Sequence, residues 1–410
     1  MDPNVDYLSG ETWARDDMHE VMRWLRRNAP VYWSETNQLW ILSKFRDVST
    51  VSKNPAIFCS GQGVRPGLTI KQSLIDEDDP KHTRLRRLIN KGFTPRMVKK
   101  LEQAFGEITR EAIDAVASKG ECDFVDDIAV PLPLLIIAEM IGIRKQDRHR
   151  FHAWSDAMIA GDGNFDKPEI MAAAAAAFGE YSQYVSAIIE ERRQAPQDDL
   201  ISILIGAKDE GLLDGDIDLE ARGVDAEEEG MELANDELIM LLVTLMVAGN
   251  ETTRNALSGG MELLIRHPVA RQSLIEDPEK IPDAVEEMLR LVSPVLSFSR
   301  TVTRDTELGG QKILAGERVL MLYPSANRDE DVFEAPDEFH IDRRPQHLAF
   351  GIGAHFCLGA NLARMELRVA LRELLRRLPD MEFSAGGVEL QPNALVRSCA
   401  HMRVRYTPES

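Results

Sequence analysis

Cysteine is scarce in this 410-residue sequence, which also lacks long apolar runs and any excess of basic residues. The four cysteines, Cys59, Cys122, Cys357 and Cys399, have no paired spacing, which argues against a disulfide framework and favours a reducing compartment. The most apolar run, LIMLLVTLMVAG, is too short to span a bilayer, and the N-terminus MDPNVDYLSG lacks the features of a signal peptide. We therefore expect a soluble cytoplasmic protein without a membrane anchor.

The net charge is −20, because 68 acidic residues outnumber 48 basic ones. A chain without a basic footprint is not expected to bind nucleic acid. Hydrophobic residues make up 44% of the sequence and charged residues 28%, which provides for a large core and an interior ligand. The acidic segment 208–235 lacks the ligand pattern of a calcium-binding EF-hand and is interpreted as a surface insertion.

Helical patterning dominates, with interruptions at proline and glycine. The longest helix is expected at about 236–267, where Pro268 stops it, and others at 281–292 and about 358–378. Strand-like segments are short: the hairpin of PVYW and LWILS, then SFSRTVT and QKILAGERVLMLYP, and further short strands near the C-terminus. The sequence thus predicts a mainly α fold with small β-sheets.

Cys357 stands in HLAFGIGAHFCLGANLAR, residues 347–364, a loop with glycines just before a predicted helix. Backbone N–H groups at a helix N-terminus stabilise a thiolate, and glycine lets a large flat group approach the backbone closely. A zinc site would need more ligands than His347 and His355, and no CxxCH motif for covalent haem is present. The residues alone leave three interpretations: an anionic metal ligand, a buried structural thiol, or a nucleophile with a distant histidine base.

The segment FGIGAHFCLG matches the haem-binding signature of cytochrome P450s, FGxGxHxCxG, at every fixed position: Phe350, Gly351, Gly353, His355, Cys357 and Gly359. The sequence therefore resembles that family, and further motifs extend the resemblance over most of the chain. The resemblance implies the cytochrome P450 fold in one catalytic domain over residues 1–410, with b-type haem between the long helix and the cysteine loop. It also implies that the Cys357 thiolate is the axial ligand of the iron and favours cleavage of the O–O bond.

EEMLR carries the ExxR pair of the family, Glu287 and Arg290, on one face of the 281–292 helix. The resemblance implies a buried ionic lock, and losing one partner of a buried ion pair costs roughly 3–5 kcal/mol. The arginine that often completes this lock in the family is replaced by Glu338 in APDEF. Arg343 and His340 are left as candidates for its place.

The longest helix contains VAGNETTRNA, which resembles the oxygen-binding motif of the family in Ala248, Gly249, Glu251 and Thr252. A glycine inside a helix costs about 1 kcal/mol relative to alanine. Close helix packing is one explanation for this glycine, whereas the resemblance implies a local widening of the helix that makes room for dioxygen. The resemblance also implies that Thr252 hydrogen-bonds the bound oxygen and that Glu251 relays protons.

Four side chains resemble the family's partners for the two haem propionates. His82 and Arg86 share a helical face in DDPKHTRLRRL, Arg300 lies in a strand after the ExxR helix, and His355 stands beside the cysteine. Taken singly, each of them fits a surface or core-edge position. Together they supply the cations that two carboxylates require.

The sequence has no flavin or nicotinamide motif and no fused reductase domain, so electrons are expected from a ferredoxin and its ferredoxin reductase. A basic patch near the cysteine would steer such an acidic partner, although Glu366 and Glu373 also allow the interpretation of a solvated face. Its residues are Arg364, Arg368, Arg372, Arg376, Arg84, Arg87, Lys91, Arg96, Lys99 and Lys100. The resemblance implies that two electrons and two protons split dioxygen, one oxygen entering a substrate C–H bond and the other leaving as water.

The positions that form the substrate pocket in the family are mainly apolar in this sequence, which favours an apolar substrate, although core packing also explains them. They are Val64, Ile70, Met158, Val243, Val247, Val295, Leu296, Phe298, Leu395 and Val396. The segments IDEDDPKHTRLRRLINKGFTPRMV and SANRDEDVF resemble bacterial sterol side-chain and branched-lipid hydroxylases, such as the actinobacterial cholesterol 26-hydroxylases. The alternatives are hydroxylation of terpenoids or fatty acids, a peroxygenase, and a non-catalytic haem-binding sensor.

Overall fold

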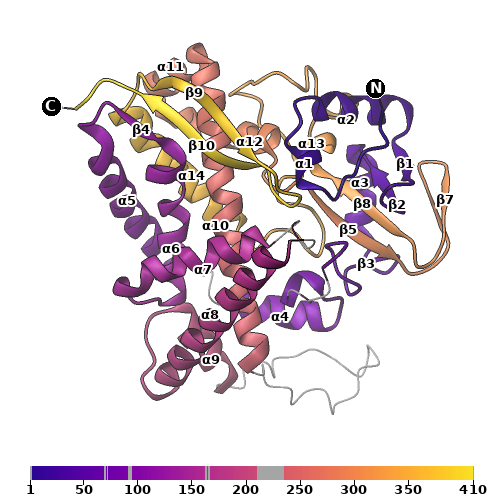
Figure 1. Cartoon of the computed structure of the whole chain (residues 1–410), viewed down its shortest axis with the longest axis horizontal. Coiled ribbons are helices and arrows are strands. Elements are labelled where there is room, and N and C mark those ends of the chain that lie inside the picture. The colour runs from indigo at the N-terminus through magenta and orange to yellow at the C-terminus, as the bar shows by residue number, and fades with distance from the viewer. Residues whose placement is uncertain are drawn as a thin grey trace.

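The computed structural model describes residues 2–68, 71, 73–90, 95–161, 164, 167–209 and 235–409, so most of the acidic segment 208–235 lies outside the described residues. The fold is mainly helical (Figure 1). Its α-helices are α1 Gly10–Trp13, α2 Met18–Asn28, α3 Phe45–Lys53, α4 Lys81–Asn90, α5 Pro95–Ala117, α6 Pro131–Ile141, α7 Arg148–Ala160, α8 Pro168–Gln194, α9 Leu200–Asp209, α10 Asn235–Arg266, α11 Pro268–Glu276, α12 Ile281–Val292, α13 Tyr323–Ala326 and α14 Ala360–Arg377. A short π-helix, η3, spans Val125–Ala129.

The strands of the described residues form three sheets. The largest has the order β1-β2-β8-β5-β3, in which β2 and β8 are parallel and the other neighbours antiparallel. Its strands are β1 Val31–Ser34, β2 Leu39–Leu42, β8 Arg318–Leu322, β5 Ser297–Val302 and β3 Phe58–Cys59. The second sheet has the order β4-β10-β9, and β6 pairs with β7; these strands are β4 Glu121–Asp123, β10 Ser398–Arg405, β9 Glu382–Gln391, β6 Thr306–Leu308 and β7 Gln311–Ile313. In Figure 1 the largest sheet lies on the N-terminal side of the molecule, and α5, α6 and α14 lie on the opposite side of α10.

The long helix α10 is the axis of the helical part. Its buried apolar side chains recur at helical spacing, among them Leu242, Met246, Leu257, Met261 and Leu264. They join the main hydrophobic core, in which α10 packs against α6, α7, α12 and α14. Since α14 follows the cysteine loop directly, this packing fixes the loop relative to the middle of α10.

The predicted fold class is confirmed, and the helix at 281–292 is α12 with the expected bounds. The helix after the cysteine begins at Ala360, two residues later than expected, because Leu358 and Gly359 belong to the turn before it. The C-terminal strands β9 and β10 are longer than predicted because they pair with each other from Glu382 to Arg405. Among the helices of the described ranges, we find none with the length and apolarity needed to cross a membrane.

Candidate active site

The loop that carries Cys357 is held in shape by its glycines and by one backbone hydrogen bond. Gly351 and Gly353 have positive φ angles of 66° and 83°. A Cβ atom at Gly353 would lie 2.5 Å from the carbonyl oxygen of Ser52, so only glycine lets the loop rest on the end of α3. The N–H of Cys357 donates to the carbonyl of Phe350 at 2.9 Å and closes the loop. The sulfur thereby lies just before the first turn of α14.

The electrostatic surroundings of Cys357 act in opposite directions. Burial raises the pKa of the thiol, while the backbone N–H of Gly359 and the guanidinium groups of Arg86 and Arg364 lower it. The predicted helix-terminus effect is therefore present through Gly359, but burial outweighs it. A bound metal cation removes the proton of a coordinating thiol, so this cysteine is suited to a metal rather than to a free thiolate.

The four predicted propionate partners are all buried or half-buried. Arg300 is only 5% exposed, and its Nη1 donates to the carbonyl of Ser299. The Nε2 atom of His82 is buried and has no hydrogen-bond partner, and the His82 and His355 rings lie 4.1 Å apart. Arg86 donates to the carbonyl of Phe356 at 2.6 Å. Within the described ranges, neither arginine has an ion-pairing carboxylate.

The pKa shifts of these groups are caused mainly by burial, and the positive charges of Arg300 and Arg86 add to the shift of His355. Burial, with Arg300, His82 and Arg86 nearby, lowers the pKa of His355 to about 3. Burial also lowers the pKa of Arg300 and of His82. A buried guanidinium is stable only next to an anion, so the cluster requires carboxylates from elsewhere. Two propionates meet that requirement, and the residues present fit haem.

Space for a flat group is visible at Gly359. Its φ angle of −83° is one that any residue adopts, and no atom lies within 4 Å of the position of a Cβ atom. Neither backbone conformation nor protein packing explains this glycine. Its place beside Cys357 is consistent with a group that approaches the backbone closely.

The middle of α10 exposes one face. Ala248 is exposed although it lies inside the longest helix, and Thr252 lies one turn further on the same face. The Thr252 hydroxyl donates to the carbonyl of Ala248 at 2.6 Å. Thr253 is buried. Of the two adjacent threonines, Thr252 is therefore the one that lies on the exposed face of α10.

The expected widening of α10 at Gly249 is not present. The helix is α-helical throughout 235–266, and a Cβ atom at Gly249 would lie 2.6 Å from Cδ1 of Ile137 on α6. Close helix packing, the alternative explanation, therefore accounts for Gly249 in this structure. The space beside Ala248 comes from the exposed face of a regular helix.

Glu251 points into the interior, on a different face from Thr252. It is 2% exposed, and its Oε2 accepts a hydrogen bond from Nη2 of Arg254 at 2.7 Å. Its Oε1 has no partner. Burial raises the pKa of Glu251, and Arg254 partly opposes that shift. Arg254 was not among the site residues predicted from the sequence, although its i,i+3 spacing from Glu251 indicates that the two side chains can pair on the helix.

The structure shows the expected buried pair of Glu287 and Arg290, joined by bonds of 2.7 and 2.8 Å. Arg343 is the third member, because its Nε donates to Oε1 of Glu287 at 3.0 Å. His340 contributes only its backbone N–H, at 3.1 Å. Of the two candidates that the sequence left open, Arg343 therefore takes the third place in the lock and His340 does not.

Some of the predicted substrate-pocket residues come from segments that the structure brings together, while Met158, Val243 and Val247 pack against the separate main core. Ile70 lies outside the described residues. The carbonyl of Val64 accepts from the N–H of Ser299, the N–H of Leu296 donates to the carbonyl of Leu395, and Val295 pairs with Val396. Val64, Leu296 and Val396 are buried. The half-buried residues are Met158, Val243, Val247, Val295, Phe298 and Leu395.

The predicted basic patch is partly neutralised by local acids, which pair with four of its eight described side chains. Arg364 pairs with Glu286, Arg372 with Glu279, Arg376 with Glu373 and Lys100 with Asp198. Lys91 and the side chain of Arg96 lie outside the described residues.

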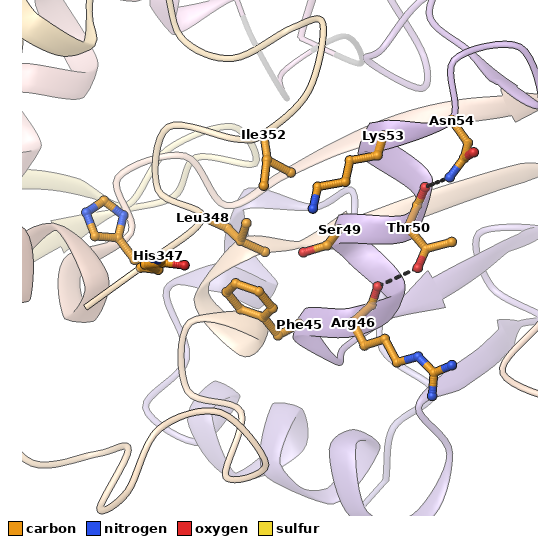
Figure 2. A pocket seen from close by; sticks show the side chains of 10 residues that line it. Phe45, Arg46, Ser49, Thr50, Lys53, Asn54, His347, Leu348 and Ile352 are labelled. Atoms are coloured by element: carbon orange, nitrogen blue, oxygen red, sulfur yellow. Dashed lines mark hydrogen bonds between the residues drawn. The ribbon is translucent and has the colours of Figure 1, made fainter.

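A cleft of about 510 Å³ lies between α3 and residues 346–352, just before Cys357 (Figure 2). Arg46 and Lys53 line it, and both are exposed. This surface therefore carries positive charge that the sequence analysis did not assign to it.

The fold and the cysteine loop define the class of haem-thiolate proteins. The family model Cytochrome P450 matches residues 7–383, and the chain belongs to that family. The family and its fold imply a haem iron held by a cysteine thiolate, together with a need for redox partners and dioxygen.

Named relatives agree with this assignment. The chain is 38% identical to a steroid C26-monooxygenase of Mycolicibacterium smegmatis, over 100% of this chain and 97% of the relative. It is 37% identical to a methyl-branched lipid omega-hydroxylase of Mycobacterium tuberculosis, over 92% and 89% of the two chains. Among solved structures, CYP109E1 of Bacillus megaterium in complex with testosterone has a TM-score of 0.82 and 33% identity, over 95% of this chain and 99% of that one. The chain is a monooxygenase.

Proposed function

We propose that this enzyme holds b-type haem through Cys357 and hydroxylates a C–H bond of a steroid, sterol or methyl-branched lipid with electrons from a ferredoxin. The observation that carries the proposal is the cluster of His82, Arg86, Arg300 and His355 beside the cysteine loop, in which buried Arg300 and half-buried Arg86 lack carboxylate partners among the described residues. When bound, haem activates dioxygen, so that one oxygen atom enters the substrate and the other leaves as water, with two electrons and two protons consumed.

Residues of the chain itself would bind the haem and supply protons at the site. Cys357 would hold the iron through its thiolate, and His82, Arg86, Arg300 and His355 would bind the two propionates. Thr252 presents its hydroxyl at the exposed face of α10, where it holds the oxygen. Glu251 would move protons between solvent and this site, since burial raises the pKa of its carboxyl and so makes it easier to protonate than an exposed one.

The substrate assignment is supported by two observations. The half-buried positions expected in the pocket are apolar, as a site for a hydrophobic ligand requires. Relatives of this chain are named for steroid and methyl-branched lipid oxidation, and a solved neighbour holds testosterone. Terpenoids and unbranched fatty acids are the competing substrates.

The ferredoxin partner is supported by the surface beside Cys357. Arg46 and Lys53 in the cleft are exposed, and Arg87, Lys99 and Arg368 are also exposed. Their positive charge in an acidic protein is complementary to an acidic partner. The arginines of α14 that are already paired contribute less to this attraction than the sequence implied.

Substrate binding is expected to displace water and change the spin state of the ferric haem. Sterols, methyl-branched fatty acids, unbranched fatty acids and terpenoids would be titrated into the holoenzyme, and each ligand that shifts the spectrum would be incubated with ferredoxin, its reductase and isotopically labelled dioxygen. We expect labelled monohydroxylated products from the sterol or branched-lipid class. Tight binding of these ligands without any labelled product would instead exclude them as substrates.

Thr252→Ala is expected to lower the product formed per electron pair by about tenfold, because a positioned proton-transfer group typically contributes at least that much. Electrons should then appear in hydrogen peroxide or water, while the rate of electron consumption stays similar. The matched control is Thr244→Ala, which removes the same type of hydroxyl-to-carbonyl bond earlier on α10, from Thr244 to Met240 at 2.8 Å. Full coupling in the Thr252 variant would remove this residue from the mechanism.

A further inference from the structure

Two buried glutamate–arginine pairs with i,i+3 spacing occur in this protein, and they differ in how completely they are satisfied. In the pair of Glu287 and Arg290, both carboxylate oxygens accept hydrogen bonds and every guanidinium nitrogen donates. In the pair of Glu251 and Arg254, Oε1 of the glutamate and Nε of the arginine are buried and have no hydrogen-bond partner among the described residues. A fully bonded pair fixes structure, whereas a half-bonded pair leaves one oxygen able to exchange a proton.

The free oxygen of Glu251 is held at a defined place by its neighbours. Oε2 accepts from Nη2 of Arg254 at 2.7 Å, and Asn255 donates to the backbone carbonyl of Glu251 at 2.8 Å. Arg254 is itself only 8% exposed. Since both ends of the interaction are buried, rotation of the carboxyl requires that the guanidinium move with it.

The charged groups that act on this carboxyl come from two elements, α10 itself and α7. Burial raises the pKa of Glu251, Arg254 lowers it, and Asp156 on α7 raises it. Beyond Arg254 lies Asp126 of η3, whose raised pKa Arg254 also opposes. Asp126 lies 3.5 Å from His401 of β10, which pairs with Asp123 at the surface. Arg254 is thus the cation between the buried carboxyl and a titratable surface cluster.

We propose that Arg254 is a positioning residue for Glu251: by binding Oε2 it holds the carboxyl so that Oε1 stays free to exchange protons. The inference rests on the relay role proposed above for Glu251. Each proton that leaves the carboxyl inward is replaced by one from solvent, so the carboxyl ends each turnover in its starting state. Arg254 itself neither donates nor accepts a transferred proton.

The experiment uses the holoenzyme with its redox partners and compares Glu251→Gln, Arg254→Gln, Arg254→Lys and the double variant Glu251→Gln with Arg254→Gln. The matched control is Arg266→Gln, which breaks the i,i+4 pair with Glu262 on the same helix, at 3.0 Å. Four quantities are measured: the carbon monoxide spectrum, product per electron pair, the solvent isotope effect on turnover, and the pH profile of kcat.

We expect normal carbon monoxide spectra in all variants. The product formed per electron pair should fall about 100-fold in Glu251→Gln and about tenfold in Arg254→Gln. The loss is smaller in Arg254→Gln because the acid itself remains. Without the cation the pKa of Glu251 rises further, so the corresponding limb of the pH profile moves to higher pH. Arg254→Lys keeps the charge and should keep the position of that limb, while coupling is only partly retained. The double variant should behave like Glu251→Gln alone.

The outcomes separate the two proposals. If Glu251→Gln turns over normally, the relay role fails, and the positioning role fails with it. If Glu251→Gln is impaired while Arg254→Gln keeps the wild-type coupling, isotope effect and pH profile, only the role of Arg254 is refuted. Additive losses in the double variant would show that Arg254 acts on something other than Glu251.

Discussion

Replacing Cys357 by serine is expected to reduce monooxygenase turnover to background and to remove the absorption band of the reduced carbon monoxide adduct after which the family is named. A thiolate pushes electron density to haem iron and favours O–O cleavage, which a neutral hydroxyl does not do. The surrounding loop tolerates the exchange, because the N–H of residue 357 still donates to the carbonyl of Phe350. The measurements are the carbon monoxide difference spectrum and product formation with dioxygen.

A cysteine elsewhere in the chain provides the control for this prediction. Cys122 is half-buried on β4 and free. Cys122→Ser removes a thiol without touching the loop, so haem content, spectrum and turnover should match the wild type. Retention of the thiolate band in Cys357→Ser would overturn the assignment of the axial ligand, and with it the proposed role of the cation cluster beside the loop.

The sequence predicted those parts of the site whose structure is determined by residues close together in the chain. The bounds of α12 follow from hydrophobic periodicity and the proline at 282, and Glu287 and Arg290 share a face because the helix is regular. The loop of Cys357 is defined by glycines whose positive φ angles and close contacts exclude other residues. Such features need no knowledge of the rest of the fold.

The parts that the sequence did not predict depend on tertiary partners. Gly249 matched an oxygen-binding motif, yet its nearest neighbour is Ile137 from α6, more than a hundred residues away in the chain. The arginine stripe of α14 resembled a docking patch, yet Glu286 of α12 binds Arg364. Arg343 completes the lock from a position that differs from the family pattern. In each case the deciding contact joins elements that no local pattern relates.

Replacing Glu287 by glutamine is expected to lower the free energy of unfolding by about 3–5 kcal/mol, because it leaves a buried guanidinium without its anion. Glu287 and Arg290 are both 0% exposed, and Arg343 also donates to the glutamate. Because proteins are stable by only about 5–15 kcal/mol, this loss removes a large share of the stability and should lower the amount of holoenzyme that accumulates. The effect reaches the haem site through Arg290, which binds the carbonyls of Asn327 and Pro336 in the segment leading to the cysteine loop.

The measurement is the denaturant midpoint of the purified chain together with the rate of haem loss, because a cofactor-bound chain need not unfold in one step. Glu279→Gln is the matched control: its pair with Arg372 is exposed, so its removal should change stability by less than about 1 kcal/mol. Glu287→Met with Arg290→Met removes both charges and should be less damaging than the sum of the single changes. It should still fall short of the wild type, because the carbonyls that Arg290 binds lose their donor. Wild-type stability in Glu287→Gln would mean that this buried triad contributes nothing to the fold around the cysteine.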